Sequence, residues 1–227
     1  MDETLLDNPV WHALSGPHAA LGAQFGTARR YLPDVAPFVA LEAMDVERLR
    51  ELTPALTAAG PGAILTLDPV AAVEAGPVVD RTAVVLQMMA RQFRPFTRPA
   101  AYRPLGLADV PEMLDLVALT HPGPFGRRTI EMGRYIGIEA DGKLIAMAGE
   151  RMRLPGFTEV SAVCVHPDHR GQGYAKVLVS AVAESIVARG ETPFLHSYPD
   201  NRPAIATYEA LGFTGRRQLH FTLLRAG

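Results

Sequence analysis

The chain has 227 residues, enough for one large domain or two small ones, and its hydrophobic fraction of 48% can build a packed core. A formal net charge of −2 excludes the global basic field that would recruit nucleic acid or an anionic membrane. A single cysteine excludes a disulfide framework and a cysteine-rich metal site, and it favours a reducing compartment.

The first residues give no signal for export or membrane insertion. The chain starts with Met1, Asp2 and Glu3, which are acidic where a secretory signal would be basic. Residues 10–28 lack charged side chains other than histidine, but they contain Ser, Gly, Pro and Gln, which a bilayer core would reject. We therefore expect a cytoplasmic protein with no membrane and no nucleic-acid partner.

The first part of the chain has short and mixed signals. Apolar runs predict strands over 38–41, 63–67 and 84–90, and residues 46–58 predict a helix despite Pro54. The basic segment 91–99 holds two prolines and is the best candidate for a linker. We therefore predict an N-terminal α+β module of unknown role over residues 1–98 and a second domain over residues 99–227.

The second part of the chain has clearer periodicity. Asp141 and Gly142 predict a hairpin turn, Gly190 is placed to end a helix, and Asp200 or Asn201 is placed to begin one. The expected helices cover 109–119 and 174–189 and a segment after residue 201, and the expected strands cover 135–139, 144–150, 159–165, 192–198 and 219–224. Hairpins followed by a strand–helix–strand unit imply a mixed, mostly antiparallel sheet flanked by helices, in the α+β class.

The segment from Ser161 to Ala175 reads as a strand, a proline turn, a glycine-rich loop and the first turn of a helix. Amide groups at a helix start lack intrahelical partners and carry the positive end of the helix dipole, so a pyrophosphate fits there. The loop lacks the Gly-Lys-Ser/Thr ending of a P-loop. It also lacks a dinucleotide fingerprint, because Lys176 stands at the third glycine and the next strand ends in His-Ser-Tyr.

Two motifs resemble one family. The segment Arg-Gly-Gln-Gly-Tyr-Ala at 170–175 is similar to the Arg/Gln-x-x-Gly-x-Gly/Ala signature of the GNAT superfamily of acyl-CoA-dependent N-acyltransferases. The segment from Asn201 to Phe213 resembles that superfamily's Asn-x-x-Ala-x-x-x-Tyr-x-x-x-Gly-Phe helix. The residues around the loop are similar to the branch with glycine N-acyltransferase-like C-terminal domains. The resemblance covers about residues 100–227 and implies a GNAT-like fold there.

The resemblance also implies residue roles toward acetyl-CoA, the expected acyl donor. The strand before the loop would pair its main chain with the pantetheine arm, and Tyr208 would face the CoA sulfur, although Tyr208 also suits a core position in an amphipathic helix. Asn201 would cap its helix, meet the CoA arm, or do both. The expected CoA-binding residues are Val163, Cys164, Val165, Arg170, Gly171, Gln172, Gly173, Tyr174, Ala175, Asn201 and Tyr208.

The sequence offers three candidates for the general base. Glu159 lies where many GNAT enzymes keep a base, and strand alternation places it on one face with Ser161 and Val163. A solvated carboxylate at the start of a strand is the equal alternative, and Glu150 and His196 are rival bases. With Tyr208 as the acid, Glu159 is the second expected catalytic residue.

Cysteine and metal chemistry are not expected. Cys164 on a central strand is a poor nucleophile, because burial raises the pKa of a thiol. The set Cys164, His166 and His169 has no fourth ligand at a suitable spacing, so we expect no metal.

The function implied is transfer of an acetyl or longer acyl group from acyl-CoA to a primary amine of a small molecule or amino acid. The alternative is a non-catalytic module that binds or senses acyl-CoA. We expect the acceptor near residues 121–134, where Arg127 and Arg128 suit a carboxylate-bearing molecule or merely form a solvated loop. The oligomeric state is open, with a homodimer as one alternative.

Overall fold

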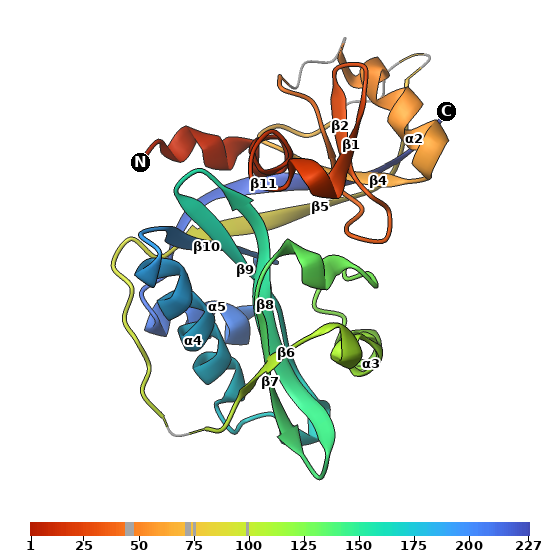
Figure 1. Cartoon of the computed structure of the whole chain (residues 1–227). Coiled ribbons are helices and arrows are strands. Elements are labelled where there is room, and N and C mark those ends of the chain that lie inside the picture. Colours follow the sequence, from red (N-terminus) through yellow and green to blue (C-terminus); the bar gives the residue numbers. More distant parts are fainter. Residues whose placement is uncertain (44–47, 71–73, 75, 99) are drawn as a thin grey trace.

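The computed structural model describes residues 1–43, 48–70, 74, 76–98 and 100–227, which form two sheets with flanking helices (Figure 1). The small sheet has the order β1 (Gly22–Phe25), β2 (Ala28–Tyr31), β3 (Val39–Ala40). The large sheet has eight strands, in the spatial order β4 (Gly62–Thr66), β11 (Thr214–Arg225), β5 (Val78–Met89), β10 (Thr192–Ser197), β9 (Phe157–Val165), β8 (Lys143–Leu154), β7 (Tyr135–Ala140), β6 (Arg103–Leu105).

The helices cover both faces of the large sheet. α4 (Tyr174–Ala188) and α5 (Arg202–Ala210) pack on one face, and α3 (Val110–Thr120) packs on the other (Figure 1). α1 (Pro9–Leu14) and α2 (Thr53–Ala59) lie with the small sheet at one end of the molecule (Figure 1). The fold is therefore α+β with a mixed, mostly antiparallel sheet, as the sequence predicts; among the described strands, β9 and β10 form the parallel pair.

The large sheet contains strands from both predicted parts of the chain. β5 lies between β11 and β10, and β4 pairs with the other edge of β11. Residues 1–98 thus contribute two strands to the sheet that residues 99–227 complete. The domain boundary between residues 98 and 99 stays a prediction from composition. Strands from both sides of this boundary belong to one sheet.

Several expected elements differ in extent. β5 and β11 are 12 residues each, longer than expected, because they pair with one another along their length and this pairing carries polar residues such as Arg81 and Arg217 into the ladder. The helix expected over 46–58 is a 3₁₀ turn (Arg48–Leu52) followed by α2, in whose first turn Pro54 lies. Proline suits that position because its missing N–H has no helical partner. Residues 46 and 47 lie outside the described residues.

A β-bulge in β9 corrects one expectation. Ala162 has φ of 51°, and the register with β8 shifts between the pairs Met147↔Cys164 and Gly149↔Ser161. The extra residue interrupts the alternation of faces. Val163 therefore joins the core beneath α4 and α5, whereas Ala162 and Cys164 pack on the α3 side. The prediction that Val163 shares a face with Glu159 and Ser161 is wrong for this reason.

Candidate active site

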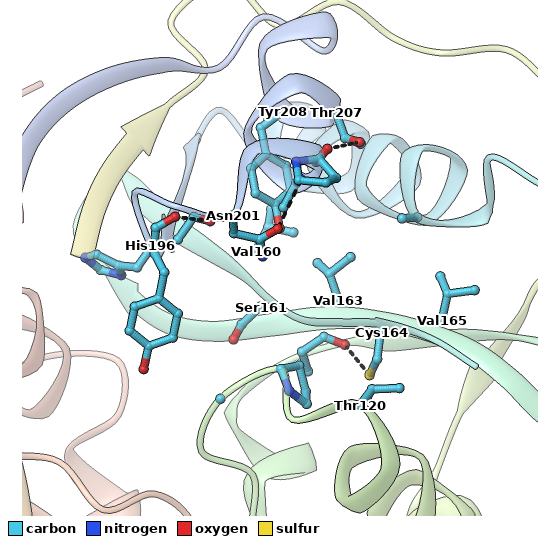
Figure 2. A pocket seen from close by; sticks show the side chains of 18 of the residues that line it. Thr120, Val160, Ser161, Val163, Cys164, Val165, His196, Asn201, Thr207 and Tyr208 are labelled. Atoms are coloured by element: carbon cyan, nitrogen blue, oxygen red, sulfur yellow. Dashed lines mark hydrogen bonds between the residues drawn. The ribbon is translucent and has the colours of Figure 1, made fainter. Parts of the chain in front are cut away.

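A cavity of about 660 Å³ opens where two neighbouring strands diverge. The parallel pairing of β9 and β10 ends at Phe194↔Glu159, so the rest of β9 has no ladder partner on that side. The cavity is lined by residues 160–165 of β9, by 169–176, by 196–198 at the end of β10, and by parts of α5 and of the segment 120–124. Figure 2 shows side chains along this opening, with His196 and Val165 near opposite ends of the view.

The glycine-rich loop lies at the N-terminus of α4, as predicted. Gly171 and Gly173 have φ of 75° and 78°, in the left-handed region that favours glycine. The amide of Val177 bonds to the carbonyl of Gly173 at 3.1 Å, so the three preceding amides of the helix lack an intrahelical acceptor. Arg170 Nε lies 3.4 Å from the Val165 carbonyl, and its side chain is exposed. The loop thus combines free amides, a helix dipole and a cation.

Sequence reasoning missed Arg98. The segment treated as a linker runs along α4, where the amide of Phe96 donates to Ser180 Oγ at 2.8 Å and Lys176 Nζ lies 4.3 Å from the Phe96 ring centroid. This path brings the Arg98 guanidinium to the loop, where it donates to the carbonyl of Gln172. The arginine-rich composition of 91–99 was the available signal, because exposed cations in a linker can also serve a nearby anion site.

The strand residues Val163, Cys164 and Val165 line the cavity, as Figure 2 shows. Cys164 is buried, and burial raises the pKa of its thiol to about 12. Its Sγ lies 3.2 Å from the Ala162 carbonyl. The thiol is therefore protonated near neutral pH, which supports a packing role.

Asn201 directly precedes α5, and Tyr208 lies in its last turn. Asn201 Oδ1 accepts a hydrogen bond from the Ala204 amide at 3.4 Å, so this residue caps the helix. Tyr208 points from α5 toward β9 and lines the cavity (Figure 2). It also packs against Phe213, with ring centroids 6.1 Å apart. Burial raises the pKa of its phenol to about 12, so the hydroxyl is a proton donor at neutral pH.

Glu159 is fully buried and does not line the cavity. Its carboxylate accepts hydrogen bonds from Arg151 Nε and Nη2 at 2.8 and 2.7 Å, and His196 Nδ1 lies 2.7 Å from Oε1. Although burial alone would raise the pKa of this carboxyl, the charge and hydrogen bonds of Arg151, aided by His196, lower it to about 2. The two partners, Arg151 and His196, do line the cavity.

Of Glu150, His166 and His169, only His169 lines the cavity. Glu150 is paired with Arg189 at 2.9 Å and does not line the cavity. His166 and His169 have ring centroids 5.7 Å apart, and the described residues contain no group of three or more side chains suited to hold a metal ion.

The two arginines proposed for a carboxylate-bearing acceptor are outside the cavity. Arg128 Nε lies 2.7 Å from Glu131, and its Nη1 lies 3.6 Å from Asp34. Arg127 is exposed, and neither residue lines the cavity.

Comparison with known proteins decides the family. The model of the FR47-like protein family matches residues 135–222. A crystal structure assigned to the GNAT acetyltransferases, from Novosphingobium aromaticivorans, is 41% identical over 98% of both chains, with a TM-score of 0.88. The chain belongs to the GNAT family of acetyltransferases. Membership implies an acyl-CoA donor and an amine acceptor.

More distant structures share the fold of this GNAT protein. A GCN5-related N-acetyltransferase from Kribbella flavida is 17% identical, covers 95% of this chain and 96% of its own, and has a TM-score of 0.60. A GCN5-related N-acetyltransferase-like protein from Streptococcus suis is 13% identical, with coverages of 96% and 92% and a TM-score of 0.61. No curated protein matches the chain. None of the helices in its described part has the length and apolarity that a bilayer crossing requires.

Proposed function

We propose that this GNAT protein transfers the acetyl group of acetyl-CoA to the primary amine of a small molecule or amino acid, by direct attack in a ternary complex. One observation carries the proposal. A single cavity joins the amide-rich start of α4, the unpaired edge of β9 and the side chain of Tyr208. The phosphates, the pantetheine arm and the thioester of acetyl-CoA would thus each meet a suitable surface.

The diphosphate of CoA fits the loop before α4. The free amides of the first helical turn face an anion favourably, and Gly171 presents no Cβ that would keep phosphate oxygens away. A Cβ on Gly171 would point into open space, where nothing lies within 4 Å. Arg170 and Arg98 add positive charge beside this loop.

The pantetheine arm would lie along Val163–Val165. Because β10 has diverged from this part of β9, the main-chain groups of β9 on that side have no partner among the described strands, and only a long contact of 3.4 Å joins Arg170 Nε to the Val165 carbonyl. The amides of the arm would pair there like an added strand. The side chains of Val163 and Val165 belong to the core beneath α4, so the binding surface there is mainly backbone.

Tyr208 would supply the proton for the leaving group. The amine nitrogen attacks the thioester carbonyl and forms the C–N bond, the C–S bond breaks, and the thiolate takes the phenolic proton. The nitrogen then releases one proton, which water carries to the phenolate. A phenol with a pKa of about 12 holds its proton at neutral pH, and the phenolate left after the transfer is basic enough to take up the proton that the amine nitrogen releases.

The surroundings of Glu159 support a positioning role. Its oxygens are occupied by Arg151 and His196, and a carboxylate with a pKa near 2 is a weak base. We propose that Glu159 orients these two cavity-lining side chains and does not itself touch the amine.

Two measurements test the function. Calorimetry should detect binding of CoA, and acetyl-CoA mixed with a panel of amines should release free thiol. Tight CoA binding without thiol release from any amine would favour the non-catalytic alternative. If calorimetry detects no binding at millimolar CoA, the proposal is wrong.

Tyr208→Phe tests the proposed acid. We expect kcat to fall about 100-fold, because general-acid catalysis contributes at least that much, while the Kd for CoA stays within about twofold. Tyr198→Phe is the matched control, since this second phenol also lines the cavity but is 43% exposed. If only the control loses activity, Tyr198 takes the role assigned to Tyr208.

A further inference from the structure

The cavity extends past the reacting region to an apolar end. Four side chains from separate elements meet there: Phe38 before β3, Leu65 on β4, Val85 on β5 and Phe221 on β11. Leu65 and Phe221 are direct partners across the β4–β11 ladder, and the rings of Phe38 and Phe221 pack edge to face at 6.3 Å. We call these four residues the apolar end.

The charged side chains that line the cavity are basic. Among the described residues that line it, none is an aspartate or a glutamate. Arg151 borders the apolar end, with its Cζ 5.2 Å from the ring centroid of Phe38. Its charge is already compensated, because the bidentate bond to Glu159 occupies two of its nitrogens.

We propose that the acceptor is a primary amine with an apolar, uncharged body that packs on the apolar end. This inference rests on the proposed function and names the class of its acceptor. A second cation on the acceptor would be desolvated against Phe38 and Phe221 with no carboxylate to pair with. A carboxylate on the acceptor would meet an arginine that Glu159 has already neutralised.

Three amines of nearly equal length test the class on the unaltered protein. Hexylamine ends in a methyl group, cadaverine in a second ammonium, and aminocaproate in a carboxylate. We expect kcat/KM for hexylamine to exceed that for either charged amine by about 100-fold, with the difference mainly in KM, because only the far end of the molecule changes.

Variants of Phe221 test whether the apolar end causes the preference for hexylamine. Phe221→Glu places a carboxylate there and should raise kcat/KM for cadaverine relative to hexylamine by at least about tenfold. Phe221→Leu keeps the site apolar and should raise KM for hexylamine a few-fold without changing the preference. Phe93→Leu is the matched control, because Phe93 is also half-buried but does not line this cavity. CoA binding by each variant reports whether it has folded.

The outcomes separate this inference from the function on which it rests. Equal or better turnover of cadaverine or aminocaproate would overturn the acceptor class and leave the acetyltransferase standing. A KM for hexylamine that Phe221→Leu and Phe93→Leu raise equally would also overturn it. Thiol release from no amine at all would remove the proposed function, and the acceptor class with it.

Discussion

Gln87 determines which nitrogen of His196 carries the proton. Arg216 Nη1 donates to Gln87 Oε1 at 2.9 Å, so the amide nitrogen of Gln87 is the group that faces Leu6 O at 2.9 Å and His196 Nε2 at 3.1 Å. An amide nitrogen only donates, so His196 Nε2 accepts and Nδ1 bears the hydrogen that Glu159 receives. Arg216 is in turn paired with Asp7 at 2.7 Å. A chain of polar contacts thus joins the N-terminal segment to the cavity.

The buried pair of Glu159 and Arg151 predicts a loss of stability in acid. The pKa of the Glu159 carboxyl is about 2 in the folded protein, below its ordinary value of 4.5. A lowered folded-state pKa contributes stability above the unfolded value, and this contribution is lost as pH falls from 4.5 toward 2. The contribution is about 3 kcal/mol near neutral pH.

Urea unfolding of the wild-type protein and of Glu159→Gln between pH 7 and pH 3 measures this effect. The variant should be less stable at pH 7 by about 3 kcal/mol, because Arg151 is left buried without its partner charge, and it should show a shallower acid slope. Glu209→Gln, at an exposed carboxylate, is the control and should match the wild type. If the free energy of unfolding of Glu159→Gln falls with pH as steeply as that of the wild type, the pair of Glu159 and Arg151 is not the source of the acid sensitivity.

At the scale of the elements, β9 creates the site by separating from its neighbour. Its bulge at Ala162 and the end of its pairing with β10 after Phe194↔Glu159 leave the strand with a free edge. α4 then begins at the loop that follows this strand and points its amides into the same opening. Strand and helix thus form two walls of one cavity because they are consecutive in the chain.

The loop glycines give a prediction at this scale. Gly171→Ala should weaken CoA binding at least about tenfold, since a Cβ would stand where the diphosphate approaches. It should also cost about 1 kcal/mol of stability, because φ of 75° is unfavourable for alanine. Calorimetry and urea unfolding give the two values.

Gly26→Ala is the control that separates the effect of backbone strain from the effect on CoA binding. Gly26 lies between β1 and β2 with φ of 61°, and a Cβ there also meets open space. This control should lose a similar amount of stability and keep the wild-type affinity for CoA. Equal loss of affinity in both variants would mean that the loop does not hold the diphosphate.

At the scale of the whole molecule, the shared sheet predicts that the two parts of the chain fold together. β5 forms ladders with both β10 and β11, so a chain beginning at residue 99 would expose two strand edges that are now paired. We expect this shortened chain to lack a cooperative thermal transition by circular dichroism. A sharp transition with retained CoA binding would show that residues 99–227 form an independent domain, as their composition suggests.

Much of the fold and part of the site follow from local sequence. The hairpin at Asp141–Gly142, the helix that ends before Gly190 and the cap at Asn201 were predictable, because turn and cap geometry depend on residues close in the chain. The loop from Arg170 to Ala175 was predictable for the same reason. Its glycines and the helix start that follows are consecutive.

Tertiary structure alone decided the rest. The burial of Glu159 between Arg151 and His196, the arrival of Arg98 at the loop and the apolar end around Phe38 and Phe221 join residues far apart in the sequence. The face of Val163 depended on a bulge that local alternation does not encode. Such contacts arise when strands pair across long separations, and the pairing partner of a strand is set by the packing of the whole sheet.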